Sequence, residues 1–377
     1  MKTYLWPLAL SLFCLFSVAG AEPVGLDAHY QDQFSSPNNR WKGADGAYSI
    51  PLLPNHLGTP CSLWLFSDTL VDDGKKSVTM FHNSYALEDD RGFHFYIKEL
   101  FHPDGKGWFW LYSGLASPAP QLLGEMRTTP TNGRSRLSIF LGQFEETNGP
   151  EGFNFRFVRS WLAQAEIDPS NSKAPLQVID SRPLPLSWAK RGHWGASIVA
   201  ADEQAPGQAG YSYVFGTNDR GLEKDLLVSR VATTALIDGA DHWNEWEFFD
   251  GNAFALDNST IKGLQFVGID GQLHQLNVSN ELTVEREGST WNLIFQNHDR
   301  VFHCQSSKPE GPYSNPEEIY RIRESAAGVI TYNAKIHPQH TKNGQWLMSY
   351  NRNALPVKQV FEHPELYRPQ FVRIPKP

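Results

Sequence analysis

Two aspartates early in the chain could act as the acid and the base of a hydrolytic reaction. Asp45 precedes the apolar segment AYSIPL, and Asp68 follows the segment LWLFS. Glycoside cleavage requires two carboxyl groups beside the scissile bond, one protonated and one ionised. Both aspartates also fit an ordinary structural role, because Asp in a turn often accepts hydrogen bonds from nearby main-chain amides. The position of the flanking strands decides between these interpretations.

A third carboxylate, Glu281, and several polar or aromatic residues stand at comparable places later in the chain. Asp45 could pair with Asp68 at short range or with Glu281 at longer range. Carboxyl groups about 5–5.5 Å apart would predict retention of the anomeric configuration, and groups about 6.5–9.5 Å apart would predict inversion. Glu145 and Glu146 are further candidates for the proton donor. The predicted substrate-binding residues are His193, Trp194, Asn297, Tyr332, Asn333, Arg352 and Asn353.

Three histidines could ligate a metal, but their spacing does not favour it. His193, His298 and His337 are far apart in the sequence, and no tight arrangement such as H-E-x-x-H is found. We therefore predict no metal site and no cofactor, with a structural cation in a central channel as the alternative. The chain also lacks a Gly-rich phosphate loop and a G-x-S-x-G nucleophile elbow, which disfavours nucleotide and esterase chemistry.

The composition indicates β structure. Aromatic residues make up 13% of the chain, with 12 Trp, and the chain has 30 Gly and 25 Pro. Aromatic residues favour strands, whereas Gly and Pro favour the turns between strands. No long segment combines helical periodicity with capping signals, so we expect few helices.

Five short aromatic-rich segments recur along the chain and predict a repeat. They are LWLFSDT, LSIFLGQF, SYVFGTND, WNLIFQNH and WLMSYNRN, and each follows a turn and another candidate strand. Five units of about four antiparallel strands predict an all-β, five-bladed β-propeller, with a pair of β-sandwiches as the competing fold. In a propeller blade, the start of the innermost strand lies beside the end of the antiparallel second strand. The candidate residues would therefore gather at one rim of the central channel.

The first 21 residues have the features of a secretory signal peptide. Lys2 precedes a short apolar stretch, and an A-x-A cleavage motif follows. We predict a signal peptide at 1–21, a single propeller domain at 22–377, and a secreted or periplasmic location. No later segment is apolar over the length that a membrane helix needs. The net charge of −8 disfavours nucleic acid and anionic membranes as partners, so we expect a monomer that binds carbohydrate.

In its motifs the sequence resembles the five-bladed β-propeller glycosidases, a superfamily that includes arabinanases, xylosidases, invertases and levansucrases. It is most similar to a little-characterised bacterial branch of secreted proteins related to the endo-D-arabinanases of mycobacterial type. The motifs that carry the resemblance follow one another from about Trp41 to Ile374, and they are GADGAYSIPL, LWLFSDT, HNS, SNELTVEREG, SSKPEGPYSNPEEIY, YNAKIHP and LMSYNRN.

The resemblance implies roles for the acidic residues. An acid at the start of the first innermost strand acts as base or nucleophile in the superfamily, and Asp45 holds this position. The proton donor of the better-known members is a glutamate of the third blade, but the third unit here opens with HWGAS and offers no carboxylate. Glu281, in the fourth unit, is the nearest substitute. We expect a glycoside hydrolase acting on an arabinan-like or other polysaccharide, with a non-catalytic carbohydrate-binding β-propeller as the alternative.

Overall fold

The structure is a computed structural model in which strands predominate. It describes residues 24–35, 40–52, 61–75, 77–117, 135–150, 152–168, 171–185, 192–200, 210–221, 223–323 and 328–377, so the expected signal peptide at 1–21 lies outside the described residues. The α-helices within these ranges are α1 (Ala28–Ser35), α3 (Thr233–Asp238) and α4 (Gln359–Glu362). Short 3-10 helices are η2 (Ala240–Glu245), η3 (Asn258–Thr260) and η4 (Pro364–Tyr367). No helix in the described part of the chain is both long and apolar enough to cross a membrane.

Five antiparallel sheets of four or five strands are found among the described residues, and they follow the order of the chain. The first contains β3 (Tyr48–Leu52), β4 (Cys61–Phe66), β7 (Ser84–Asp89) and β8 (Gly92–Tyr96). The second contains β9 (Trp108–Ser117), β10 (Ser135–Glu146), β11 (Phe155–Ile167) and β12 (Leu176–Pro183). The third contains β13 (His193–Ala200), β14 (Tyr211–Asp219), β15 (Lys224–Ala232), β16 (Glu247–Phe249) and β17 (Phe254–Ala255).

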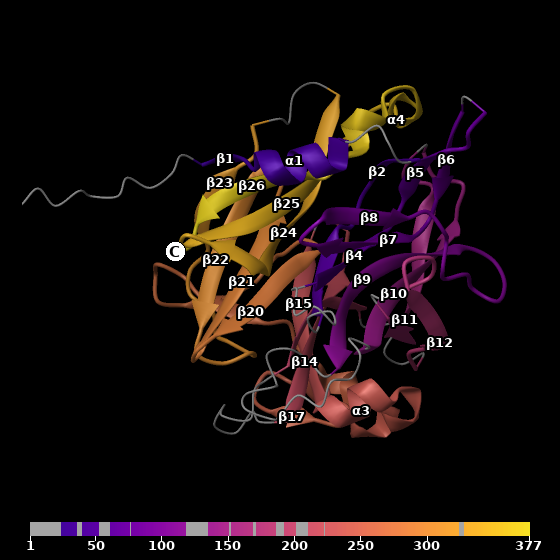
Figure 1. The fold of residues 1–377 in the computed structure, drawn as a ribbon. Helices are drawn as coiled ribbons and strands as arrows, with labels where there is room; N and C mark the ends of the chain where they lie inside the picture. The colour runs from indigo at the N-terminus through magenta and orange to yellow at the C-terminus, as the bar shows by residue number, and fades with distance from the viewer. Residues whose placement is uncertain are drawn as a thin grey trace, which may run out of the picture.

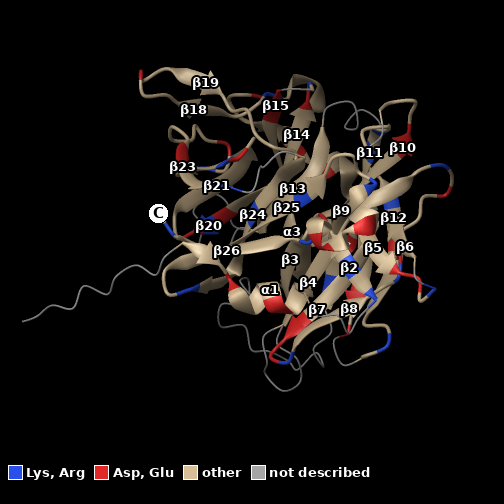
Figure 2. Ribbon diagram, turned by 90° about the horizontal axis from the view of Figure 1, so that it is seen from above, with Lys and Arg blue, Asp and Glu red and all other residues tan. Residues whose placement is uncertain are grey.

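The fourth and fifth sheets complete this series. The fourth contains β20 (Leu282–Glu287), β21 (Thr290–Asn297), β22 (Arg300–Ser306) and β23 (Glu317–Arg321). The fifth contains β24 (Val329–Lys342), β25 (Gln345–Ala354), β26 (Gln370–Pro375) and β1 (Gly25–Leu26). Two smaller sheets contain β2 (Trp41–Ala44), β5 (Thr69–Asp72) and β6 (Val78–Phe81), and β18 (Gln265–Val267) and β19 (Leu273–Gln275). Seen from above, β18 and β19 form a ribbon at the edge of the molecule (Figure 2).

The first strands of the five sheets contact one another in a cycle. β3 contacts β9, β9 contacts β13, β13 contacts β20, β20 contacts β24, and β24 contacts β3. In each sheet the first strand pairs with the second in antiparallel orientation, as in the register Tyr48↔Leu65. The predictions of an all-β chain and of these five strand pairs are therefore confirmed.

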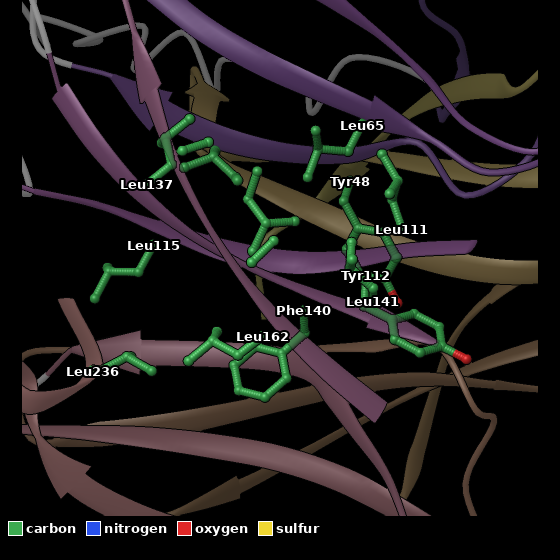
Figure 3. Close-up of a cluster of buried hydrophobic side chains, with 14 of the residues drawn as sticks. Tyr48, Leu65, Leu111, Tyr112, Leu115, Leu137, Phe140, Leu141, Leu162 and Leu236 are labelled. Carbon is green, nitrogen blue, oxygen red and sulfur yellow. The ribbon is translucent and has the colours of Figure 1, made fainter. Parts of the chain in front are cut away.

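The largest apolar core lies between the first three sheets. Leu65, Leu111, Leu137 and Phe140 are fully buried there, and Figure 3 shows their side chains converging from the neighbouring sheets. Burying one such side chain contributes roughly 1.5–3 kcal/mol relative to leaving it in water. α3 adds Leu236 to this core from the opposite end of the molecule to α1 and α4 (Figure 1). The packed sheets thus give the first strands a rigid support.

The fifth sheet is built from both ends of the described chain. Gly25 of β1 pairs with Arg373 of β26, and the Arg373 guanidinium lies 2.7 Å from the Asp27 carboxylate. α1 follows β1 and lies along β26 (Figure 1). Its buried side chains, Tyr30 and Phe34, pack on an aromatic cluster that joins the first and fifth sheets. The two sheets are therefore held to each other at one side of the ring of contacts.

Candidate active site

One cavity of about 900 Å³ is bordered by the starts of the first strands and the ends of the second strands. Five sheets supply residues to it, which is the arrangement that the antiparallel register predicted. The predicted site residues that line it are Asp45, Asp68, His193, Glu281, Asn297, Tyr332, Asn333 and Asn353. Residues separated by more than 300 positions in the sequence thus share one site.

Asp45 and Asp68 are joined through the main chain at the rim of the first sheet. The amide of Asp45 donates to the carbonyl of Asp68 over 3.0 Å, and the amide of Ser67 donates to the carbonyl of Asp45 over 3.1 Å. The next residue, Gly46, has a φ of +83°. Its α-carbon lies close to the main chain of Ser67, because a β-carbon added to Gly46 would be 3.0 Å from the Ser67 amide nitrogen. This left-handed turn favours glycine and lets the chain pass from β2 into β3. Asp45 is thereby fixed beside Asp68.

The Asp45 carboxyl group has two different oxygens. Oδ2 accepts hydrogen bonds from the phenols of Tyr332 (3.1 Å) and Tyr367 (2.7 Å). Oδ1 is buried and has no hydrogen-bond partner among the described residues. Burial raises the pKa of Asp45 well above its usual range, and the nearby charges of Asp68 and Glu281 raise it further. A proton on this carboxyl group would therefore sit on Oδ1.

Asp68 is held by hydrogen bonds from two side chains. Its Oδ1 accepts the indole N–H of Trp110 over 2.7 Å and lies 2.8 Å from Nδ1 of His82. Burial acts to lower the pKa of His82, but the hydrogen bond and charge of Asp68 outweigh burial, and the pKa of His82 rises. The His82 ring stacks on Trp108 at a centroid distance of 4.7 Å. A carboxylate with two N–H donors on one oxygen is suited to act as a base or nucleophile.

Glu281 is bound to a buried lysine. Lys335 Nζ lies 2.6 Å from Glu281 Oε2, and Asn333 Nδ2 donates to Oε1 over 2.8 Å. The Lys335 side chain is only 2% exposed, and it also donates to the carbonyls of Gly46 and Asn333 and lies 4.4 Å from the centre of the Tyr48 ring. Burial raises the pKa of Glu281, and the charge of Lys335 opposes this shift. Both Glu281 oxygens thus accept hydrogen bonds, and an ionised carboxylate, which has only acceptors, fits this arrangement.

Polar and aromatic side chains form the rest of the cavity wall. The His193 ring stacks on Phe157 at a centroid distance of 3.7 Å, and burial lowers the pKa of His193 to about 4, so the imidazole is neutral near pH 7. Asp219 also lines the cavity, and Asn280 Nδ2 donates to its carboxylate over 2.8 Å. Trp110 packs against Phe144 at a centroid distance of 4.1 Å. The lining therefore combines aromatic rings with amides and carboxylates.

The three histidines that could have formed a metal site are not brought together. His193 and His298 line the cavity, whereas His337 lines a second cavity of about 450 Å³. His337 lies between two serine hydroxyls, with Nδ1 2.7 Å from Ser49 Oγ and Nε2 2.9 Å from Ser349 Oγ. Within the described residues, no group of three or more His, Cys, Asp or Glu side chains is arranged to hold a metal ion.

Two predicted binding residues do not line the cavity. Trp194 is 1% exposed, and its ring packs against Phe248 in the core. Arg352 donates from Nη2 to the carbonyl of Glu365 over 2.9 Å, which connects β25 to η4. Adjacent residues of a strand point to opposite faces, so Trp194 is directed away from the face of His193, and Arg352 away from that of Asn353. These two predictions are corrected to a core and a structural role.

The alternative acids and one further aromatic residue also lie elsewhere. Glu145 pairs with Arg156 at 2.9 Å, and Glu146 accepts from Asn154 over 3.2 Å, both at the end of the β10–β11 hairpin. Neither glutamate lines the cavity. Tyr367 is the main residue that the sequence did not reveal. It belongs to η4, an irregular segment that no strand pattern marks, and yet it binds Asp45.

Comparison with known proteins assigns the chain to a family. The family described as "Domain of unknown function (DUF5005)" matches residues 27–376. The chain belongs to this family. No curated protein matches the sequence. The matched range includes every residue that lines the cavity.

Two solved structures are similar to this chain at low sequence identity. A candidate hydrolase from Bacteroides ovatus ATCC 8483 aligns with a TM-score of 0.63 and 16% identity, covering 93% of this chain and 90% of that one. The GH43_1 enzyme from Xanthomonas citri, solved with xylose, aligns with a TM-score of 0.46 and 12% identity, covering 92% of each chain. At 16% identity the first likeness shows a common fold.

Proposed function

We propose that the chain is a secreted glycoside hydrolase that cleaves a polysaccharide or oligosaccharide, with an arabinan-like glycan as the first candidate. In this proposal residues 22–377 form a five-bladed β-propeller, and 1–21 are removed on export to the periplasm or the medium. The cycle of contacts through β3, β9, β13, β20 and β24 supports the propeller. The cavity lies where these strands begin, at one end of the ring.

The observation that carries the proposal is the pairing of two carboxyl groups in opposite surroundings. Asp45 has a raised pKa and an oxygen without a protein donor, whereas Asp68 accepts two N–H donors. Glycosidases need such a pair, with one carboxyl group protonated and the other ionised. The main-chain hydrogen bond between the two residues places both groups at one rim.

The hydrogen bonds favour Asp45 as the acid and Asp68 as its partner. The Asp45 carboxyl group lines the cavity, and it would give its proton to the glycosidic oxygen once the buried Oδ1 turns toward the substrate, as the bond to the anomeric carbon breaks. Asp68 would take a proton from the attacking water, or attack the anomeric carbon itself. Water supplies the new hydroxyl group and releases one proton, which returns to Asp45 directly if Asp68 was the nucleophile, or from Asp68 through solvent if Asp68 was the base.

Glu281 fits a different role from the proton donor that the family resemblance implies. Lys335 and Asn333 occupy both of its oxygens, so donation would first require loss of a charged hydrogen bond. We assign Glu281 to the electrostatics of the site, because its charge raises the pKa of Asp45. Asn297, Asn353 and the neutral His193 offer hydrogen bonds to sugar hydroxyls from the same cavity.

The test is hydrolysis of a panel of plant and microbial polysaccharides by the purified protein, followed by chromatography of the released sugars. Asp45→Asn and Asp68→Asn should each lose activity by on the order of 10³-fold while remaining folded. Asp90→Asn is the matched control, because Asp90 is an exposed aspartate outside the cavity. It should retain full activity.

A carbohydrate-binding protein without catalysis is the alternative, and the fixed Glu281–Lys335 pair is the observation that favours it. Calorimetry on the same panel separates the two functions. Binding without release of sugars, unchanged in Asp45→Asn, would exclude the hydrolase. Release that depends on both aspartates would exclude the binding protein.

A further inference from the structure

Two segments from opposite neighbours of the first sheet meet beside the two aspartates. One is the tip of the β10–β11 hairpin in the second sheet, and the other is the segment 355–368 that follows β25 in the fifth sheet. A β-carbon added to Gly152 would lie 2.4 Å from Val357 Cγ2, so the two segments are in contact at this point. Gly152 has a φ of +82°, and both it and Val357 line the cavity. We call this contact the bridge.

The hairpin side of the bridge is held by its own hydrogen bonds. The amide of Thr147 donates to the carbonyl of Asn154 over 2.5 Å, and the amide of Phe153 donates to the carbonyl of Pro150 over 2.9 Å. Phe153 is 54% exposed and lines the cavity next to Gly152. These hydrogen bonds hold the described residues of the tip, 147–150 and 152–154, at the cavity edge.

The segment 355–368 is anchored more firmly still. Val360 and Tyr367 are buried in an apolar cluster with Leu70 of β5, and Val357 packs against the same cluster. Gly43 of β2 lies so close to η4 that a β-carbon there would be 2.8 Å from the carbonyl oxygen of Tyr367. The side chains of Arg352 and Arg368 bind main-chain carbonyls on either side of this contact. The segment is thus fixed to the small sheet of β2, β5 and β6 and to the fifth sheet.

Both aspartates are connected to the two segments of the bridge, Asp45 directly and Asp68 through Trp110 of β9. Asp45 accepts from Tyr367, at the end of the segment 355–368. Asp68 accepts from Trp110, whose ring packs against Phe155 at a centroid distance of 4.8 Å, directly after the hairpin tip. The carboxyl groups therefore lie at the side of the cavity that the bridge borders.

A polysaccharide can be cut at internal bonds only if the chain passes the carboxyl groups and leaves on both sides. The bridge closes one of these sides, since two anchored segments touch there. We infer that the enzyme acts at chain ends, with the terminal sugar held between the aspartates and the bridge and the rest of the chain leaving past the opposite wall. This inference rests on the proposed hydrolase function and opposes the internal cleavage that the endo-D-arabinanase resemblance suggests.

The experiment follows product size with time on the polysaccharide that the panel identifies. The wild-type protein should release a single short product from the first minutes, while the viscosity of the solution falls slowly. Val357→Gly removes the side chain that contacts Gly152, and it should raise the share of longer oligosaccharides several-fold. Leu366→Ala is the matched control, because Leu366 packs on the same apolar cluster but does not line the cavity. It should leave the product pattern unchanged.

The outcomes separate the two proposals. An early ladder of oligosaccharides with rapid loss of viscosity from the wild-type protein would overturn action at chain ends and leave the hydrolase function intact. An unchanged product pattern in a folded Val357→Gly protein would show that the bridge does not cause the action at chain ends. The absence of any released sugar across the panel would overturn the hydrolase function, and the inference with it.

Discussion

The amide of Asp45 donates a hydrogen bond to the carbonyl of Asp68, so the two candidate catalytic residues are positioned by the main chain itself. Their side chains then find different partners, phenols for Asp45 and N–H donors for Asp68. Rigid positioning of unlike carboxyl groups is what general acid–base catalysis needs. The predictions below test this arrangement.

Tyr367→Phe should change the pH dependence of activity. Loss of the phenol removes a donor that stabilises ionised Asp45, so the pKa of Asp45 should rise. A hydrogen bond to a charged group contributes about 1.5–3 kcal/mol, which corresponds to roughly one to two pH units. If Asp45 is the acid, the basic limb of the kcat–pH profile shifts to higher pH. If Asp45 is the base, the acidic limb shifts to higher pH instead.

Tyr96→Phe is the control for this prediction, because the Tyr96 hydroxyl donates to the carbonyl of Ser172 away from the cavity. Its pH profile should match that of the wild-type protein. A Tyr367→Phe profile without displacement of either limb would contradict a direct effect on Asp45.

Asp45→Asn should stabilise the protein in a pH-dependent way. The pKa of Asp45 is raised in the folded state, so the folded chain keeps a proton that the unfolded chain loses. Wild-type stability therefore falls as the pH rises from about 4 through the raised pKa. The Asn side chain does not ionise, so the variant does not lose stability in this way. The difference in Tm between variant and wild type should therefore grow as the pH rises from about 4 and should vanish at lower pH. Thermal unfolding measured across pH values checks this.

Asp219→Asn should behave in the opposite way. Burial acts to raise the pKa of Asp219, but hydrogen bonds from Asn280 and Gly221 outweigh it, and the pKa falls below its usual range. Ionised Asp219 thus stabilises the fold above the ordinary carboxyl pKa, and this stabilisation is lost as the pH falls through the lowered value. The variant should be less stable than the wild type near pH 7. Equal pH trends for the two variants would contradict the opposite pKa shifts of Asp45 and Asp219.

Lys335→Met should be strongly destabilising because it leaves Glu281 buried without its counter-ion. Breaking a buried pair on one side costs about 3–5 kcal/mol. The double variant Lys335→Met/Glu281→Gln removes both charges and should recover most of that loss. Chemical denaturation of the two single variants and the double variant gives the coupling energy. Additive losses would mean that the two side chains do not act as a pair.

Trp110→Phe should lower kcat by about 10- to 100-fold, the effect of removing one hydrogen bond to a charged group at the reacting centre. Trp161→Phe is the matched control, since its indole N–H donates to Gln143 Oε1 over 3.0 Å and Trp161 does not line the cavity. Measurement of kcat for both variants on the same substrate tests this prediction. Equal losses would indicate a general effect on packing.

Much of the site followed from strand pairing alone. The segments around Tyr48 and Leu65 were recognisable as neighbouring strands, and antiparallel pairing then places Asp45 beside Asp68. The same logic placed Glu281 and Asn297 at that rim. The strand pattern of the sequence is sufficient to place these residues because each of them lies at the end of a regular strand.

The remaining errors arose at the level of single side chains. Trp194 follows His193 on β13, and strand alternation sends only one of the two toward the cavity. Tyr332 and Asn333 both line it, because Asn333 has a φ of +61° and the ladder shifts register there. Tyr367 was missed because its position depends on tertiary packing of an irregular segment.

The pairing of Gly25 with Arg373 has a consequence for biosynthesis. The strand at residues 25–26 must wait for residues 370–375 to be translated, so the fifth sheet can be completed only after all of the residues between them have been made. Until then, β25 presents an open edge that could pair with another nascent chain. A circular permutant that joins the two paired strands by a short linker should therefore fold with fewer aggregates than the natural order of translation.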